Sequence, residues 1–324
     1  MKEDDGVQAL VSKLRLFLEK RYRLKISRLE RLDRGVLFLE EPAEGKKWIV
    51  RIFSGNRPIE RVNGDAEVLR FLELNNFPAE RCASKDPVTS PGGWSILVSE
   101  YIDGQRMDPI PANLRKLGSS LGLLNAIPLG SGAETRDAGS LHHYTKVEGL
   151  PRNEIEAANY WLKEVSDQVS VNNQDVFESL REQIAGVDEC EGLPCTLIHP
   201  DPMLKNVIQA TDGELKWIDW TGAGRGPRLY SLAIFLWSGA LRPAGWSAES
   251  VDAMVSGYRD YIDLSKDEIE RLPDLMKIRQ IIFACWRFRR SIKEEIQPNG
   301  KEWWWPDYDV VDSVSKRAAE ALQE

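Results

Sequence analysis

Residues 197–220 (LIHPDPMLKNVIQATDGELKWIDW) constrain the fold of this chain more than any other stretch. Two apolar runs within it are separated by Thr-Asp-Gly at 211–213, a strong turn signal, so the sequence predicts a β-hairpin. Because a hairpin returns the chain on itself, we expect Asn206 and Asp219 at the same end of its two strands. Asp201 would lie just ahead of them, so that three oxygen-bearing side chains meet in one place.

The polar residues of this stretch also have a specific spacing. His199, Asp201 and Asn206 form the pattern His-x-Asp-x4-Asn, and Ile-Asp-Trp at 218–220 follows. The pattern resembles the catalytic and metal-binding loops of the protein-kinase-like fold, in the form used by aminoglycoside phosphotransferases and choline-kinase-like small-molecule kinases. The resemblance implies a two-lobed α+β fold, with an antiparallel β-sheet in the N-lobe and a mainly α-helical C-lobe.

The same resemblance implies a reaction, which is ATP- and Mg²⁺-dependent transfer of the γ-phosphate to a hydroxyl of a small molecule. Such a transfer needs a positioned hydroxyl and a divalent cation on the phosphates. Asp201 is the expected base, and Asn206 and Asp219 offer the hard oxygen ligands that suit Mg²⁺. His199 is expected to support the catalytic loop through hydrogen bonds. Lys205 is either a positive charge near the phosphates or an exposed loop lysine.

The N-terminal part alternates apolar and polar residues with period two, which is typical of antiparallel strands. Gly35 lies in the turn between the first two strands, which is either an ordinary hairpin turn or a phosphate-covering loop. Arg51 lies in the third strand, where protein kinases carry a phosphate-binding Lys and small-molecule kinases of this type often depart from it. An Arg there still supplies a fixed charge and can bind two phosphate oxygens.

A helix predicted at residues 62–74 offers an acidic partner for the cation on the third strand. By its register in the family, Asp65 is the expected partner of Arg51, and Glu67 is the alternative. The two acids are two residues apart and point to different faces of a helix, so only one of them can reach the strand.

A change from strand-rich to helix-rich sequence predicts an N-lobe at residues 1–103 and a C-lobe at residues 104–324. The segment before this boundary resembles the hinge of the family, where backbone groups of Glu100 and Ile102 would bind the adenine edge. The helix predicted after the boundary, at residues 114–127, contains two glycines that permit the close approach of a neighbouring element.

The rest of the C-lobe is predicted to be helical, and in this architecture such helices and the insert before the catalytic loop select the acceptor. The insert, residues 129–150, carries adjacent histidines at 142–143, and tryptophans gather at 303–305. The helices are predicted at residues 153–168, 174–185, 229–241, 247–262, 266–293 and 308–322.

The charge of the chain limits the classes of molecule that it is expected to bind. The net charge of −8 and the pI near 5.3 argue against nucleic acid and anionic membranes and favour a cationic or neutral acceptor, such as an aminoglycoside-like or amino-alcohol compound. The charged N-terminus predicts neither a signal peptide nor a membrane span, so we expect a cytoplasmic protein. The sequence does not specify an oligomeric state.

Three other interpretations compete with a small-molecule kinase. A metal-dependent hydrolase is disfavoured, because such sites recruit more histidines than the three in this chain. A protein kinase is disfavoured, because no Ala-Pro-Glu-type segment follows Asp219. A non-catalytic nucleotide-binding scaffold of the same fold stays open, because Arg51 replaces Lys and the phosphate turn has one glycine.

Overall fold

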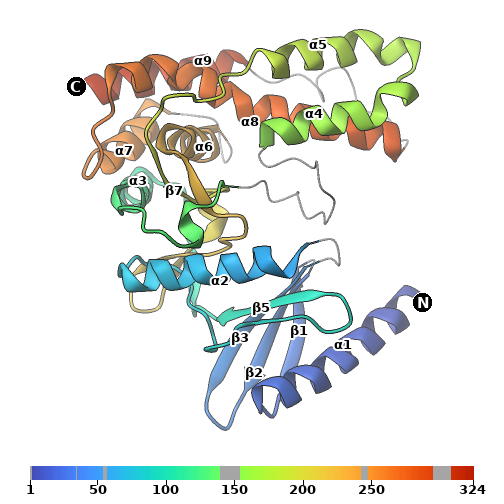
Figure 1. The fold of residues 1–324 in the computed structure, drawn as a ribbon. Helices are drawn as coiled ribbons and strands as arrows, with labels where there is room; N and C mark the ends of the chain where they lie inside the picture. Colours follow the sequence, from blue (N-terminus) through green and yellow to red (C-terminus); the bar gives the residue numbers. More distant parts are fainter. Residues whose placement is uncertain (1, 34, 54–56, 139–153, 242–246, 295–307) are drawn as a thin grey trace.

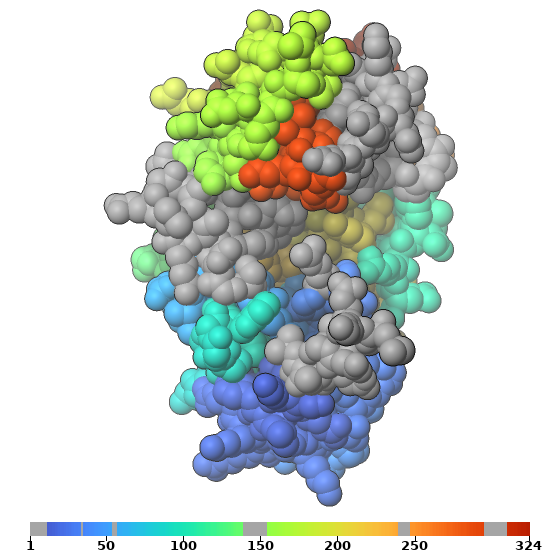
Figure 2. All heavy atoms as spheres, turned by 90° about the vertical axis from the view of Figure 1, so that its right-hand side faces the viewer, coloured from blue at the N-terminus to red at the C-terminus, as the bar shows by residue number. Residues whose placement is uncertain are grey.

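A computed structural model describes residues 2–33, 35–53, 57–138, 154–241, 247–294 and 308–324. It combines an antiparallel β-sheet at the N-terminal side with a larger helical part (Figure 1), which confirms the predicted α+β class. In the side view of Figure 2 the blue N-terminal part lies below the green and red helices, and the yellow part of the chain is visible between them. The predicted boundary near residue 103 falls between the strands β5 and β6.

The N-terminal sheet has five strands in the order β1-β2-β3-β5-β4, each antiparallel to its neighbour. Helix α1 (Lys2–Tyr22) packs on it through Leu14 and Leu18, because an apolar sheet face must be covered. Val36 pairs with Arg51, so the β1–β2 turn lies at the end of the sheet that carries Arg51. The strands are β1 (Arg28–Asp33), β2 (Val36–Glu41), β3 (Lys46–Phe53), β4 (Val88–Thr89) and β5 (Ser95–Glu100).

Two small sheets build the loops between the lobes. Strands β8 and β9 form the predicted hairpin, with Val207 opposite Trp217, and β6 pairs with β8. Strand β7 leads into residues 199–206, the expected catalytic loop, and pairs with β10, which follows residues 218–223, the expected metal-binding loop. The strands are β6 (Gly104–Arg106), β7 (Cys195–Ile198), β8 (Val207–Ala210), β9 (Leu215–Trp217) and β10 (Gly224–Pro227).

Helices make up the rest of the described chain, and each predicted helix has a counterpart. The predicted helix at 266–293 is found with those bounds as α8, capped by Ser265 and Glu268 in a capping box. No helix among the described residues is long and apolar enough to cross a membrane. The helices are α2 (Ile59–Leu74), α3 (Pro111–Ala126), α4 (Glu154–Val165), α5 (Gln174–Ala185), α6 (Arg228–Leu241), α7 (Ala248–Tyr258), α8 (Lys266–Lys293) and α9 (Tyr308–Gln323).

Helices α3 and α7 approach each other closely, as the two glycines of α3 predict. A Cβ atom at Gly118 would lie 2.1 Å from the carbonyl oxygen of Met254, and one at Gly122 would lie 2.5 Å from that of Tyr258. Gly257 of α7 makes the reciprocal approach to Arg115. The backbones can therefore pack at this distance only without side chains at these positions.

We expect Gly118→Ala to lower the free energy of unfolding by about 2 kcal/mol, because a methyl group cannot fit against a backbone carbonyl without moving a helix. Gly186→Ala is the matched control, since a Cβ atom there has its nearest neighbour at 3.5 Å. Urea unfolding of both variants measures the difference. Equal stability of the two variants would contradict the packing argument.

Candidate active site

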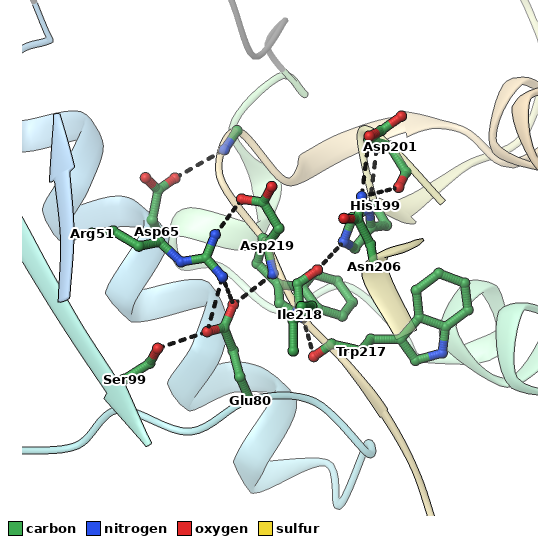
Figure 3. A network of polar contacts seen from close by, with 12 residues as sticks. Arg51, Asp65, Glu80, Ser99, His199, Asp201, Asn206, Trp217, Ile218 and Asp219 are labelled. Carbon is green, nitrogen blue, oxygen red and sulfur yellow. Dashed lines mark hydrogen bonds and ion pairs between the residues drawn. The ribbon is translucent and has the colours of Figure 1, made fainter. Parts of the chain in front are cut away.

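Arg51 is placed by β3 and joins two carboxylates (Figure 3). Its Nη1 donates to Oδ1 of Asp219 at 2.5 Å, and its Nη2 donates to Oε1 of Glu80 at 3.1 Å. Burial by itself would lower the pKa of Arg51, but Glu80 and Asp219 raise it overall. The side chain, 11% exposed, is therefore a permanent cation between the lobes.

Glu80 is a site residue that the sequence interpretation missed. It is 4% exposed and accepts hydrogen bonds from the Ser99 hydroxyl and the Asp219 backbone N–H, both at 2.7 Å. Ala79 forms a bridge with Trp217, which brings this segment beside the hairpin. The sequence offers one weak signal, an acid that follows the uncharged Phe-Pro-Ala at 77–79.

The predicted pair between Asp65 and Arg51 is wrong. Asp65 is 1% exposed and accepts hydrogen bonds from Arg57, from Arg136 at 2.5 Å and from the backbone N–H of Gly222 at 3.1 Å. The alternative acid of this helix, Glu67, is exposed. Helix α2 thus presents its buried acid to the C-terminal part of the chain and leaves the strand cation to Glu80.

The Asp65 cluster joins α2 to the chain after the metal-binding loop. Arg136 crosses α2 at Gly64, where a Cβ atom would lie 2.3 Å from Nη1 of the arginine. Its Nε donates to the carbonyl oxygen of Ala223 at 2.9 Å. One buried carboxylate therefore holds arginines from two parts of the chain and fixes the backbone at residues 222–223.

His199 supports the catalytic loop from a fully buried position. Its Nε2 bonds to the carbonyl oxygen of Ile218 at 3.0 Å, and its Nδ1 accepts the backbone N–H of Asp201 at 3.1 Å. A neutral imidazole with the proton on Nε2 satisfies both bonds. Burial lowers the pKa of His199, so the ring stays neutral and ties the two loops together.

Asp201 lies in the same loop with both carboxylate oxygens bonded. Oδ1 accepts from Nη2 of Arg279 at 3.0 Å. Oδ2 accepts from Nδ2 of Asn206 at 3.1 Å and lies 3.0 Å from Nζ of Lys205. Arg279, on α8, is a second residue that the sequence interpretation missed, and it also contacts Glu154 at the start of α4.

Asn206 and Asp219 lie at one end of the β8–β9 hairpin, as the sequence predicts. The N–H of Ile218 donates to the carbonyl oxygen of Asn206 at 2.9 Å, which sets the two loops side by side. Asp219 has a φ of 67°, in the left-handed region, and this turn directs its carboxylate toward Arg51. Burial would raise the pKa of Asp219, but Arg51 and other positive neighbours lower it overall, so the group is ionised.

The oxygen atoms of these two side chains suit Mg²⁺, the expected metal. Asn206 uses Nδ2 to bond Asp201, which leaves its amide oxygen as the atom for a cation. No cluster of three His, Cys, Asp or Glu suited to a metal occurs among the described residues. Mg²⁺ commonly takes one or two protein oxygens and completes its shell with water and substrate phosphates.

The expected nucleotide contacts have backbone positions that suit them. Gly35 has a φ of 72°, and a Cβ atom there would lie 2.8 Å from the Ile52 carbonyl oxygen, so only glycine fits this turn beside Arg51. In the expected hinge, the N–H of Glu100 donates to the carbonyl oxygen of Arg81 at 2.8 Å. The expected contacts of Glu100 and Ile102 with an adenine stay predictions.

A cavity of about 280 Å³ lies beside the catalytic loop, between α4, α6 and α8 and the strands β7 and β10. Pro200, next to Asp201, forms part of its wall. The charged residues that line it are Asp137, Glu154, Glu189 and Arg225. The histidines at 142–143 and the tryptophans at 303–305 lie outside the described residues.

This chain is similar to known phosphotransferases. A family model described as "Phosphotransferase enzyme family" matches residues 28–265. No curated protein sequence gives a significant match.

Solved structures resemble almost the whole chain. An amicoumacin kinase in complex with AMP-PNP and Ca²⁺ has a TM-score of 0.62 at 13% identity, over 98% of this chain and 96% of that one. A choline kinase from Streptococcus pneumoniae has a TM-score of 0.57 at 17% identity, over 97% and 99%. A spectinomycin phosphotransferase with ADP and spectinomycin has a TM-score of 0.60 at 12% identity, over 96% and 98%. These likenesses confirm the predicted fold.

The neutral state of His199 predicts a pH dependence of stability. The folded chain resists protonation of His199, whereas the unfolded chain binds the proton near pH 6.5. Below that pH the unfolded state holds more protons, so the free energy of unfolding should fall as the pH drops from 6.5 to 5. In His199→Gln this part of the slope should be absent. Urea unfolding at several pH values measures it, and parallel slopes for both proteins would contradict the assignment.

Proposed function

Since the chain belongs to the phosphotransferase enzyme family, we propose that it is an ATP- and Mg²⁺-dependent kinase that phosphorylates a hydroxyl of a small molecule. One observation carries the proposal. The β8–β9 hairpin and the loops beside it bring Asp201, Asn206 and Asp219 together, with Arg51 bonded to the last of them. A base, two metal ligands and a phosphate-binding cation are the groups that phosphoryl transfer requires.

The roles follow from the chemistry of each group. The acceptor oxygen forms a bond to the γ-phosphorus as the bond to the β–γ bridging oxygen breaks, and Asp201 takes the hydroxyl proton. Asn206 and Asp219 would hold Mg²⁺, which supplies neutralisation of the phosphate charge. Arg51 contributes a fixed guanidinium that binds phosphate oxygens. His199 holds Asp201 in place, because its Nδ1 accepts a hydrogen bond from the backbone N–H of Asp201.

The acidic cavity beside the catalytic loop supports an amine-bearing alcohol as the acceptor. Three carboxylates and one arginine line it, and apolar groups such as Ile198 and Ile278 make up much of the remaining wall. Glu154 is already paired with Arg279. A cationic group would therefore gain mainly from Asp137 and Glu189, and a carbon skeleton would gain from the apolar wall. The similar solved structures include a choline kinase and a spectinomycin phosphotransferase, which is consistent with this class of acceptor.

A non-catalytic nucleotide-binding scaffold is the second candidate. The observation that favours it is the direct contact between Arg51 and Asp219, which joins the phosphate-binding cation to a metal ligand. A scaffold could keep this pair permanently, whereas an enzyme must separate it when ATP binds.

A screen for ADP release tests the enzyme proposal. We expect turnover with at least one compound in a panel of amino alcohols, aminoglycosides, sugars and macrolides. Asp201→Asn should lower kcat by about 10²- to 10⁴-fold, because the amide cannot accept the proton. Asp212→Asn, in the exposed hairpin turn, is the matched control and should keep the activity. Binding of nucleotide without turnover of any compound would favour the scaffold.

Glu80→Gln tests the role of the acid that pairs with Arg51. The neutral amide would hold the guanidinium and the Asp219 backbone less firmly. We expect the Kd for the Mg²⁺ complex of AMP-PNP to rise about tenfold, which corresponds to one lost charge-assisted hydrogen bond. Glu73→Gln, on the exposed side of α2, is the control. Calorimetry measures the Kd of both variants. An unchanged Kd for Glu80→Gln would contradict the role of Glu80 in holding Arg51.

A further inference from the structure

The expected base is covered in this structure. The side chain of Asp201 is 2% exposed, so its carboxylate has no surface on which an acceptor hydroxyl could lie. Three donors surround it, which are Arg279 on Oδ1 and Asn206 and Lys205 on Oδ2. Part of this cover must move before an acceptor hydroxyl can reach Asp201.

Two of these donors are held by further contacts. Arg279 has a side chain that is 5% exposed and also contacts Glu154, whose other oxygen accepts the Tyr230 hydroxyl at 2.5 Å. Asn206 is 5% exposed, and its amide also donates to the Asp201 carbonyl oxygen at 2.8 Å. Moving either one would break buried hydrogen bonds, which is costly.

Lys205 differs from both of them. Its side chain is 54% exposed, and its ammonium reaches Asp201 from the solvent side, four residues along the chain. The ammonium of Lys205 lies on a solvent-exposed side chain with many rotamers, so water can solvate it when it leaves Asp201. Lys205 is therefore the donor of the three that leaves Asp201 at the lowest cost.

The γ-phosphate of a bound nucleotide could bind the ammonium of Lys205. Lys205 directly precedes Asn206, in the 3-10 turn at residues 204–206, so its ammonium starts next to a proposed metal ligand. The backbone of this turn is held in place, since Arg106 donates to the Lys205 carbonyl oxygen at 2.9 Å. A γ-phosphate carries more negative charge than one carboxylate and would attract the ammonium more strongly.

We propose that Lys205 covers Asp201 in the nucleotide-free protein and transfers to the γ-phosphate when ATP binds. Lys205 is then a phosphate-binding residue, and Asp201 becomes accessible to the acceptor hydroxyl only when the phosphoryl donor is bound. The inference rests on the proposed function and adds an order to it, in which nucleotide binds before the acceptor.

An acyl phosphate derivative of ATP tests the position of Lys205 without an acceptor. The lysine amine attacks the carbonyl carbon of the probe, the carbon–oxygen bond to the terminal phosphate breaks, and an amide forms while ATP leaves and a proton goes to solvent. Arg51 cannot react in this way, because its guanidinium stays protonated. We expect mass spectrometry to find the label on Lys205 and excess Mg²⁺·ATP to prevent it.

A variant gives a second measurement. Lys205→Met keeps an unbranched side chain that is one atom shorter and removes its charge, so the Kd for the Mg²⁺ complex of AMP-PNP should rise about tenfold. Lys266→Met is the matched control, because Lys266 is 88% exposed and pairs with Glu270 on α8. Its Kd should equal that of the unmodified protein.

Binding order supplies the third measurement, with an acceptor found by the ADP-release screen. The unmodified protein should bind the acceptor only when AMP-PNP and Mg²⁺ are present, whereas Lys205→Met should also bind it alone. Acceptor binding of equal strength with and without nucleotide in the unmodified protein would overturn the covering role.

The outcomes separate this inference from the proposed function. If AMP-PNP binds but Lys205 is not labelled and Lys205→Met keeps its affinity, the inference is wrong and the kinase proposal stands. If neither AMP-PNP nor the ATP probe binds at all, both are wrong.

Discussion

The buried guanidinium of Arg51 is the group on which the rest of the site depends. A charge in this position is tolerated only when carboxylates pair with it, because desolvation of an unpaired ion costs several kcal/mol. Its partners, Glu80 and Asp219, come from the segment after α2 and from the metal-binding loop. Pairing the cation therefore forces the N-terminal sheet, the segment after α2 and the β8–β9 hairpin to meet at one point.

Two buried acids, Asp65 on α2 and Glu80 in the segment after it, pair with different arginines. This explains why the position of Asp65 in the helix gives the wrong partner for Arg51. Asp65 has the expected position in the helix, but Arg57 and Arg136 surround it and the absence of a side chain at Gly64 lets one of them cross. Glu80 reaches Arg51 because the bridge at Ala79 holds its segment against β9. Both acids become ties between the lobes, one on each side of the metal-binding loop.

Local signals explain what could be predicted from the sequence. The turn at residues 211–213 depends on neighbours in the chain, so the hairpin is found where the sequence predicts it. Glu80 and Arg279 could not be found in this way. Their roles depend on partners 139 and 78 residues away, and no spacing within their own segments reports such contacts.

The two cations proposed to bind phosphate are both paired with carboxylates that the reaction would use. Arg51 bonds to Asp219, a proposed metal ligand, and Lys205 lies on Asp201, the proposed base. Without nucleotide the site is thus neutralised internally, which lets four charged groups lie close together. Phosphates that replace the carboxylates at both cations would free Asp219 for the metal and Asp201 for the hydroxyl in one step. The ion pairs between these groups would then also make activation of the site depend on the phosphoryl donor.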